Sequence, residues 1–260
     1  MALEGKIAVV SGAAMGIGKA VVEILLQNGA KVVVLDINET AGQSLLEALN
    51  KKHGAGKTLF MKCNVESEEQ LKAAFQKTVK TFGGVDIVCN NAGILNEEEY
   101  EKTISVNLTS IIRASYVALE HMNKLSGGRG GVIINTASMA GLGPIVCCPA
   151  YTAAKFGVVG FTRALAAASE SLGYGIRINA VCPSFVQTDM KDRTPNLLGR
   201  FSVMIEALNE MCDKMGVLTT SDVAEGFMDL LKDETKNGQA LLVMPKERRC
   251  VTFPSLQSLE

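Results

Sequence analysis

Short apolar runs rich in β-branched residues alternate along this chain with segments of helical spacing. The runs lie at 7–10, 32–35, 87–89, 132–134, 178–182 and 241–244, with a weaker one at 59–61. Short runs that are apolar throughout are typical of strands buried on both faces. Strands that alternate with helices pair in parallel, with helices packed on both faces of the sheet. We therefore predict an α/β fold with one doubly wound parallel sheet, as a single domain over residues 1–260.

Two of the intervening segments carry recognisable helix ends. Apolar residues recur at intervals of three and four over 17–28, and Gly29 follows them as a helix stop signal. Ser67 and Gln70 have the spacing of a capping box, which predicts a helix over 67–82.

Composition narrows the class of protein. The net charge of −1 over 260 residues gives no attraction to nucleic acid or to an anionic membrane. No stretch reaches the roughly 18 uninterrupted apolar residues of a membrane span. The seven cysteines include no Cys-x-x-Cys pair, and two histidines are too few for a histidine metal site. We expect a soluble cytoplasmic protein with buried free thiols and no metal.

The first candidate site is the turn after the run at 7–10. Gly12, Gly16 and Gly18 allow a tight turn and a close approach of the backbone to a pyrophosphate, which the N-terminus of the following helix would bind. Asp36 ends the next run, where its carboxylate can bind ribose hydroxyls and repel a 2′-phosphate. The pattern therefore favours NAD over NADP, although a glycine turn and a strand-end Asp also occur without a ligand. These two segments give the candidate cofactor residues Gly12, Met15, Gly16, Ile17, Gly18, Asp36 and Ile37.

The second candidate site is a proton-transfer group. Tyr151 and Lys155 are four residues apart, so in a helix they lie on one face. A nearby ammonium favours the phenolate, so we expect Lys155 to lower the pKa of Tyr151 and make it a general base. Ser138 follows the run at 132–134 and is expected at the carboxyl edge of the sheet, where ligands bind. Taken alone, Tyr-x-x-x-Lys is also typical of an exposed amphipathic helix.

Together these motifs resemble the short-chain dehydrogenase/reductase family. The spacing Gly-x-x-x-Gly-x-Gly and the set Ser138, Tyr151 and Lys155 match its patterns, and the resemblance spans about residues 5–245. It implies a Rossmann-type sheet with a substrate lid over about 184–216, a stretch that otherwise reads as irregular. It adds matches that imply cofactor roles for Asn64, Val65, Asn91, Ala92, Gly93, Tyr151, Lys155, Pro183, Val186 and Thr188.

The resemblance also implies a reaction, hydride transfer between a carbinol carbon and nicotinamide. Tyr151 would exchange the hydroxyl proton, and Ser138 would bind the substrate oxygen. Lys155 would also bind the nicotinamide ribose, while Asn107 matches a fourth catalytic position that holds a water in a proton relay. Three residues depart from the family pattern at its motifs: Ser11 stands for Thr, Asn64 for Asp, and Ser184 for Gly.

Segments beyond the general motifs point to a substrate. Residues 11–18, 90–97, 101–107, 141–144 and 156–163 resemble family members that act on 15-hydroxyprostaglandins. We therefore expect oxidation of a 15-hydroxyprostaglandin or a related hydroxy-fatty acid. Cys148 departs from those members, which carry a glutamine there. The expected substrate-binding residues are Ser138, Cys148, Tyr151 and Met190.

The lid sequence supports an apolar substrate. An apolar stripe at helical spacing runs through Phe201, Met204, Ile205, Leu208 and Met211, and either lines a pocket or packs only on the core. A steroid alcohol, another carbonyl or alcohol, and a non-catalytic NAD-binding scaffold remain alternatives.

Three further features are left open by the sequence. The pair Cys147-Cys148 is either redox-sensitive or inert, and residues 246–249 form either a solvated tail or a contact for a substrate carboxylate. The family commonly pairs as homodimers, and the apolar stretch at 158–168 is the expected two-fold interface.

Overall fold

A single sheet organises the molecule. The computed structural model describes residues 2–254, so the predicted domain of 1–260 includes seven residues outside the described ones. The eight strands are β1 Ile7–Ser11, β2 Lys31–Asp36, β3 Thr58–Lys62, β4 Ile87–Asn90, β5 Gly131–Thr136, β6 Ile176–Pro183, β7 Ala240–Met244 and β8 Glu247–Cys250. Every predicted run lies in one of these strands, which confirms the α/β prediction.

The strand order explains where ligands can bind. It runs β3-β2-β1-β4-β5-β6-β7-β8, and the pairs from β3 to β7 are parallel. The chain crosses from β3 at one edge back to β4 beside β1, so the order reverses between β1 and β4. In a doubly wound sheet this switch point is open to a ligand at the carboxyl ends of the strands.

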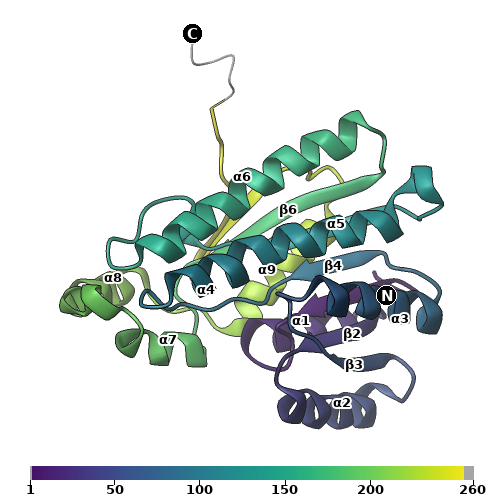
Figure 1. Cartoon of the computed structure of the whole chain (residues 1–260), viewed down its shortest axis with the longest axis horizontal. Helices are drawn as coiled ribbons and strands as arrows, with labels where there is room; N and C mark the ends of the chain where they lie inside the picture. Colours follow the sequence, from purple (N-terminus) through teal and green to yellow (C-terminus); the bar gives the residue numbers. More distant parts are fainter. Residues whose placement is uncertain (1, 255–260) are drawn as a thin grey trace.

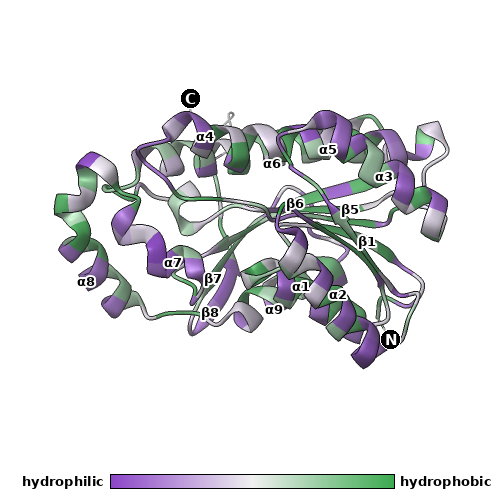
Figure 2. Cartoon of the chain, turned by 60° about the horizontal axis from the view of Figure 1, so that its bottom comes forward, coloured by the Kyte–Doolittle hydropathy of each residue, from purple (hydrophilic) through white to green (hydrophobic). Residues whose placement is uncertain are grey.

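Helices cover both faces of the sheet (Figures 1 and 2). The α-helices are α1 Gly16–Gln27, α2 Glu39–His53, α3 Glu68–Phe82, α4 Tyr100–Ile104, α5 Ser110–Met122, α6 Pro149–Ser171, α7 Asp189–Arg193, α8 Ile205–Met215 and α9 Thr220–Lys232. Apolar residues of α1, α2 and α9 share one core cluster, while those of α3, α5 and α6 share the other. None of the helices among residues 2–254 is long and apolar enough to cross a membrane.

The middle of strand β2, residues 32–35, shows why the sequence is apolar there. Val32 and Val34 belong to the cluster with α1, whereas Val33 and Leu35 belong to the cluster with α3. Because successive side chains point to opposite faces, a strand between two helical layers needs apolar residues at every position. The same reasoning accounts for the central runs that the sequence displays.

The two helix ends predicted from sequence are present with one difference. Gly29 follows α1 with a φ of +94°, a left-handed conformation that suits glycine. Ser67 caps α3 by accepting a hydrogen bond from the backbone N–H of Gln70 at 3.2 Å. The side chain of Gln70 instead accepts from the backbone N–H of Asn64, so the predicted capping box is only half formed.

The sequence suggested that the stretch at 184–216 is irregular, but the structure shows mostly helical turns there. It folds into α7, two 3-10 turns at Thr194–Asn196 and Gly199–Met204, and α8. Phe201, Met204, Ile205 and Leu208 of the predicted stripe pack on one apolar cluster, whereas Met211 is not part of it.

The segment at 246–249 is also not a free tail. Most of it forms β8, which pairs antiparallel with β7. The side chains of Glu247, Arg248 and Arg249 remain exposed, which is the part of the prediction that holds.

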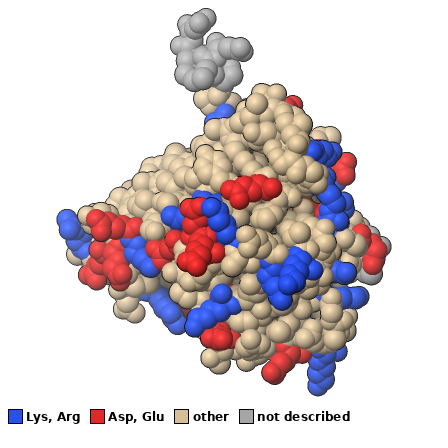
Figure 3. Space-filling view, turned by 45° about the vertical axis from the view of Figure 1, so that its right-hand side comes forward, with Lys and Arg blue, Asp and Glu red and all other residues tan. Residues whose placement is uncertain are grey.

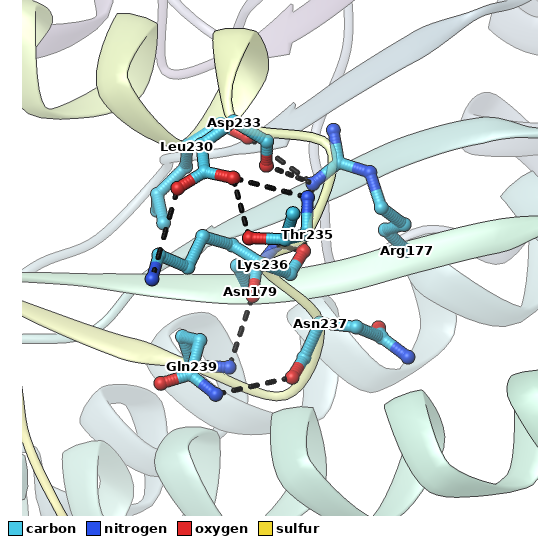
Figure 4. Close-up of polar contacts among 8 residues, drawn as sticks. All are labelled: Arg177, Asn179, Leu230, Asp233, Thr235, Lys236, Asn237 and Gln239. Carbon is cyan, nitrogen blue, oxygen red and sulfur yellow. Dashed lines mark hydrogen bonds and ion pairs between the residues drawn. The ribbon is translucent and has the colours of Figure 1, made fainter.

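Arg177 joins the end of α9 to strand β6 (Figure 4). Its guanidinium donates to the backbone carbonyls of Leu230, Leu231, Asp233 and Lys236 at 2.7–3.4 Å. Carbonyls at a helix C-terminus have no partner within the helix, so a side-chain cation there stabilises the end. Burial lowers the pKa of Arg177.

Candidate active site

The glycine-rich turn lies at the switch point between β1 and β4. A Cβ on Gly12 would lie 2.7 Å from Cα of Ala92, so only glycine permits this approach of the two loops. Asn91 braces the same contact by donating to the carbonyl oxygens of Ser11 and Gly12, both at 3.1 Å. The hydroxyl of Ser11 accepts from the N–H groups of Asn91 and Ala92, so serine supplies the contact at this departure from the family pattern.

Helix α1 presents its N-terminus to this turn. Gly16, its first residue, has a φ of +55°, and a Cβ there would lie 3.6 Å from Cγ2 of Thr188. Met15 precedes the helix without a side-chain cap, and no acidic residue occupies the first turn. The N–H groups of this turn can therefore bind an anion, which is the fit expected for a dinucleotide pyrophosphate.

Asp36 stands at the carboxyl end of β2 beside the turn. Its carboxylate accepts from the backbone N–H of Ala14 and of Asn38, each at 2.9 Å. Asp36 is thus also a brace for the glycine-rich turn, and its charge lies where an adenosine ribose is expected. Ile37 is exposed beside it.

The remaining cofactor candidates follow the same edge. Val65 is buried and Asn64 is partly buried, but Asn64 Oδ1 already accepts from the N–H of Glu66 at 3.0 Å.

A second group of cofactor candidates follows β6. Pro183 ends β6, and Val186 bridges to Leu218. Thr188 precedes α7, and its approach to Gly16 brings the strand-end segment to the glycine-rich turn. Ser184 is buried, and its hydroxyl makes no hydrogen bond with a described residue.

Tyr151, Lys155 and Ser138 gather at the carboxyl edge of β5 and β6. Nζ of Lys155 lies 5.4 Å from the centre of the Tyr151 ring and donates to the carbonyl of Thr136 at 2.8 Å. Ser138 caps a short turn after β5, where its hydroxyl accepts from the N–H of Ala140 at 3.1 Å, and its side chain acts to lower the pKa of Tyr151. The structure thus brings together the three residues on which the proton-transfer prediction depends.

The electrostatics differ from the prediction made from sequence. Burial raises the pKa of Tyr151 to about 12, although the hydrogen bond with Ser138 acts in the opposite direction. Burial also lowers the pKa of Lys155 to about 8. Desolvation disfavours the charged form of each group and is the largest cause of both shifts. The expectation that the pKa of Tyr151 is lowered is therefore wrong, because the pKa is raised.

Asn107 is fully buried in a short π-helical turn, Ser105–Thr109, between α4 and α5. Its carboxamide accepts from the N–H of Ile94 and donates to the carbonyls of Ile94 and Thr103. A π-helical turn within a longer helix often marks a functional position. A Cβ on Gly93 would lie 2.8 Å from Oδ1 of Asn107 and 3.7 Å from Nζ of Lys155, so this glycine keeps space between them.

Of the other substrate candidates, Cys148 lies beside Tyr151, whereas Met190 is not part of the same cluster. Cys148 is 2% exposed and shares an apolar cluster with Tyr151 and with lid residues that include Leu198 and Phe201. Met190 is partly buried in α7.

Glu97 is a candidate that the sequence showed only as part of a resemblance. Its carboxylate accepts from the backbone N–H of Ala150 at 3.0 Å and of Tyr151 at 2.9 Å, at the start of α6. Its own N–H donates to the carbonyl of Leu197 in the lid segment at 2.8 Å. Glu97 therefore joins the loop after β4 to the helix of Tyr151 through its buried carboxylate and to the segment at 184–216 through its backbone, a role that no local pattern reveals.

The fold and the arrangement of these residues are those of one enzyme class. The family model described as short chain dehydrogenase matches residues 6–199, and the chain belongs to this family.

Individual relatives narrow the comparison. The chain is 41% identical to 15-hydroxyprostaglandin dehydrogenase, NAD(+), of Homo sapiens over 245 residues, which is 94% of this chain and 92% of the relative. It is 42% identical to the enzyme of the same name from Bos taurus over 246 residues, with the same coverage of 94% and 92%. Borneol dehydrogenase, mitochondrial, of Lavandula x intermedia is 36% identical over 254 residues, covering 93% of this chain and 90% of the relative.

Proposed function

We propose that this chain is an NAD-dependent dehydrogenase that oxidises the secondary alcohol of an apolar hydroxy-fatty acid, with 15-hydroxyprostaglandins as the first candidates. The observation that carries the proposal is the grouping of Ser138, Tyr151 and Lys155 beside the glycine-rich turn. The names of the relatives support NAD and the prostaglandin, and the apolar cluster at Cys148 and the lid suits a lipid chain.

Each residue has a role in the proposed reaction. Bound NAD supplies the hydride acceptor, while the protein supplies position and charge. The Tyr151 phenolate takes the hydroxyl proton of the substrate, and Ser138 donates a hydrogen bond to the substrate oxygen. The protonated ammonium of Lys155 stabilises the phenolate of Tyr151. Asn107 holds the loop at Ile94 in place by hydrogen bonds to the backbone of that residue. The cofactor residues are those of the glycine-rich turn, Asp36 and the strand-end segments.

A spectrophotometric assay tests the function. Formation of NADH at 340 nm is measured with prostaglandin E2, a hydroxy-fatty acid and a steroid alcohol. We expect turnover of prostaglandin E2, and Tyr151→Phe is expected to lower kcat by at least about 1,000-fold while NADH fluorescence still reports binding. Tyr100→Phe, at an exposed tyrosine, is the matched control. If Tyr151→Phe turns over within tenfold of wild type, Tyr151 is not the proton-transfer residue. If only another alcohol is oxidised, the chain is a dehydrogenase for that class of alcohol and not for prostaglandins.

We further propose a homodimer through the exposed side of α6, which overlaps the expected stretch at 158–168. Val158, Val159, Leu165 and Ala166 of the predicted stretch are buried within the chain itself. Apart from the charged Arg163 and Glu170, most exposed residues of α6 are small or aromatic: Ala153, Phe156, Gly160, Ala164, Ala167 and Ala168. Tyr116 of α5 adjoins this side through an edge contact with Phe161. Figure 3 shows a broad surface with few charges below the C-terminal segment, the form expected of a two-fold interface.

Two further assignments complete the proposal. Residues 1–260 act as one domain, in which 184–216 form the lid. A cytoplasmic location is supported by the seven free cysteines, all within the described residues, of which Cys250 alone is partly exposed.

A further inference from the structure

Two adjacent cysteines lie in the apolar part of the candidate site. Sγ of Cys147 and Sγ of Cys148 are 3.7 Å apart, and the residues are 1% and 2% exposed. Their neighbours are apolar residues of the loop after β4 and of the lid, together with Tyr151. An opening that admits a lipid chain to Tyr151 therefore also brings it to this pair.

We propose that Cys147 and Cys148 form a dithiol that reduces an organic hydroperoxide, bound against this apolar cluster, to the alcohol and closes to a disulfide. The lipid character of the hydroperoxide rests on the proposed function. The chemistry of the pair itself rests on the two sulfur positions and their apolar surroundings.

Cys147 is the better nucleophile of the two. The hydrogen bond between the two sulfurs, in which either can donate, and a backbone N–H lower the pKa of Cys147 to about 7 despite burial and the charge of Glu97. The same contact and burial raise the pKa of Cys148, which keeps its proton. Thiolates attack peroxides, whereas buried neutral thiols are inert.

The reaction balances in two steps. The Cys147 sulfur attacks the terminal oxygen of the hydroperoxide, the O–O bond breaks, and the alkoxide leaves with a proton as the alcohol. The Cys148 sulfur then attacks the sulfenic acid, an S–S bond forms, and water leaves. Two thiols are oxidised and one hydroperoxide is reduced to its alcohol, which has the chemical class of the proposed dehydrogenase substrate.

The disulfide is expected to be easily reduced. Adjacent Cα atoms are about 3.8 Å apart, closer than the roughly 4.4–6.8 Å of ordinary disulfides. Strained disulfides are the labile ones, so a small dithiol such as dithiothreitol should restore both thiols.

Intact-mass spectrometry of the reduced full-length chain tests the proposal. We expect cumene hydroperoxide to remove two hydrogens and to yield one equivalent of 2-phenylpropan-2-ol, with peptide mapping that joins Cys147 to Cys148. Cys147→Ser and Cys148→Ser are expected to form no disulfide, whereas Cys212→Ser, at a buried cysteine of α8, behaves as wild type. Thermal unfolding shows that each variant is folded. Cumene hydroperoxide is expected to react about tenfold faster than hydrogen peroxide because of its apolar contact with the residues of this cluster.

Three outcomes would contradict the dithiol proposal. Oxygen added to one cysteine without a disulfide, a disulfide between other cysteines, or faster reaction with hydrogen peroxide would each overturn the proposal. Tyr151→Phe is expected to show the same mass change as wild type. Because the measurement needs neither NAD nor Tyr151, it gives its answer even if the chain oxidises none of the alcohols tested.

Discussion

At the scale of single residues, Tyr151 and Lys155 are both held by burial toward their uncharged forms. Their pKa values are about 12 and about 8, while proton abstraction needs the phenolate and is helped by the ammonium. Above pH 8 the pair has lost one proton, and this proton comes mostly from Lys155 because its pKa is the lower one. The reactive form, in which Tyr151 is a phenolate and Lys155 an ammonium, is then a constant fraction of the enzyme as the pH rises further. Such coupled groups titrate as a pair.

A pH profile tests this coupling. We expect kcat/KM for alcohol oxidation to rise about tenfold per pH unit up to about pH 8, the pKa of Lys155, and to level off above it. In Lys155→Arg the cation keeps its charge, so the rise is expected to continue beyond this point. A profile that is flat from pH 6 to pH 8, or an identical plateau in Lys155→Arg, contradicts the coupling.

Sequence reasoning identified these residues but not their electrostatics. Ser138, Tyr151 and Lys155 stand out because a phenol, an amine and a hydroxyl at strand and helix spacing are recognisable along the chain. The direction of the Tyr151 pKa depends on how deeply the folded chain buries the ring, which neighbours far apart in sequence decide. Glu97 was missed as an individual residue for the same reason, since its partners at 150, 151 and 197 are distant.

At the scale of elements, Glu97 positions the start of α6. Glu97→Ala removes both acceptors of the Ala150 and Tyr151 N–H groups, so the Tyr151 side chain is expected to lose its orientation. We expect kcat to fall about 10- to 100-fold with little change in the KM for NAD, because orientation matters most in the transition state. Glu97→Gln keeps one acceptor oxygen and is expected to be intermediate.

The exposed neighbour Glu98 gives the matched control as Glu98→Ala. Equal losses in both variants, or a change in KM alone, would show that Glu97 does not position Tyr151.

Arg177 holds a different element, the C-terminal end of α9. Arg177→Ala leaves four carbonyls without their donor, so we expect the free energy of unfolding to fall by about 2–4 kcal/mol in urea titrations. Arg200→Ala, at an exposed arginine of the lid, is expected to change it by less than about 0.5 kcal/mol. Similar stabilities for the two variants would show that the end of α9 is held without this cation.

The elements themselves were predictable to different degrees. Buried strands such as β2 can be recognised in the sequence as short apolar runs, because helices on both faces of the sheet require apolar side chains on both sides of the strand. Strand β8 does not, since Glu247, Arg248 and Arg249 carry no strand pattern and pair only because the backbone of β7 is adjacent. The lid helices were hidden by polar residues on their outer side, although the stripe through Leu208 revealed the inner side.

At the scale of the whole molecule, the exposed side of α6 predicts the oligomeric state. We expect light scattering to give twice the 27.6 kDa mass of one chain at micromolar concentration. Phe156→Glu places a charge on the small and aromatic surface and is expected to give monomers. Val203→Glu, at a residue exposed on the lid, is the control and should leave the dimer intact. A monomeric wild-type protein, or a dimer that survives Phe156→Glu, refutes this interface.

The edge strand β8 affects how molecules of this protein can associate in concentrated solution. An outer strand offers a row of unpaired backbone groups to any neighbouring chain, and proteins block this by keeping such strands short and charged. Strand β8 has four residues, three of them charged, and Arg248 is held by Asp229 of α9. A second molecule that extended the sheet here would have to bury these charges. Concentrated preparations should therefore resist growth into fibres from this end of the sheet.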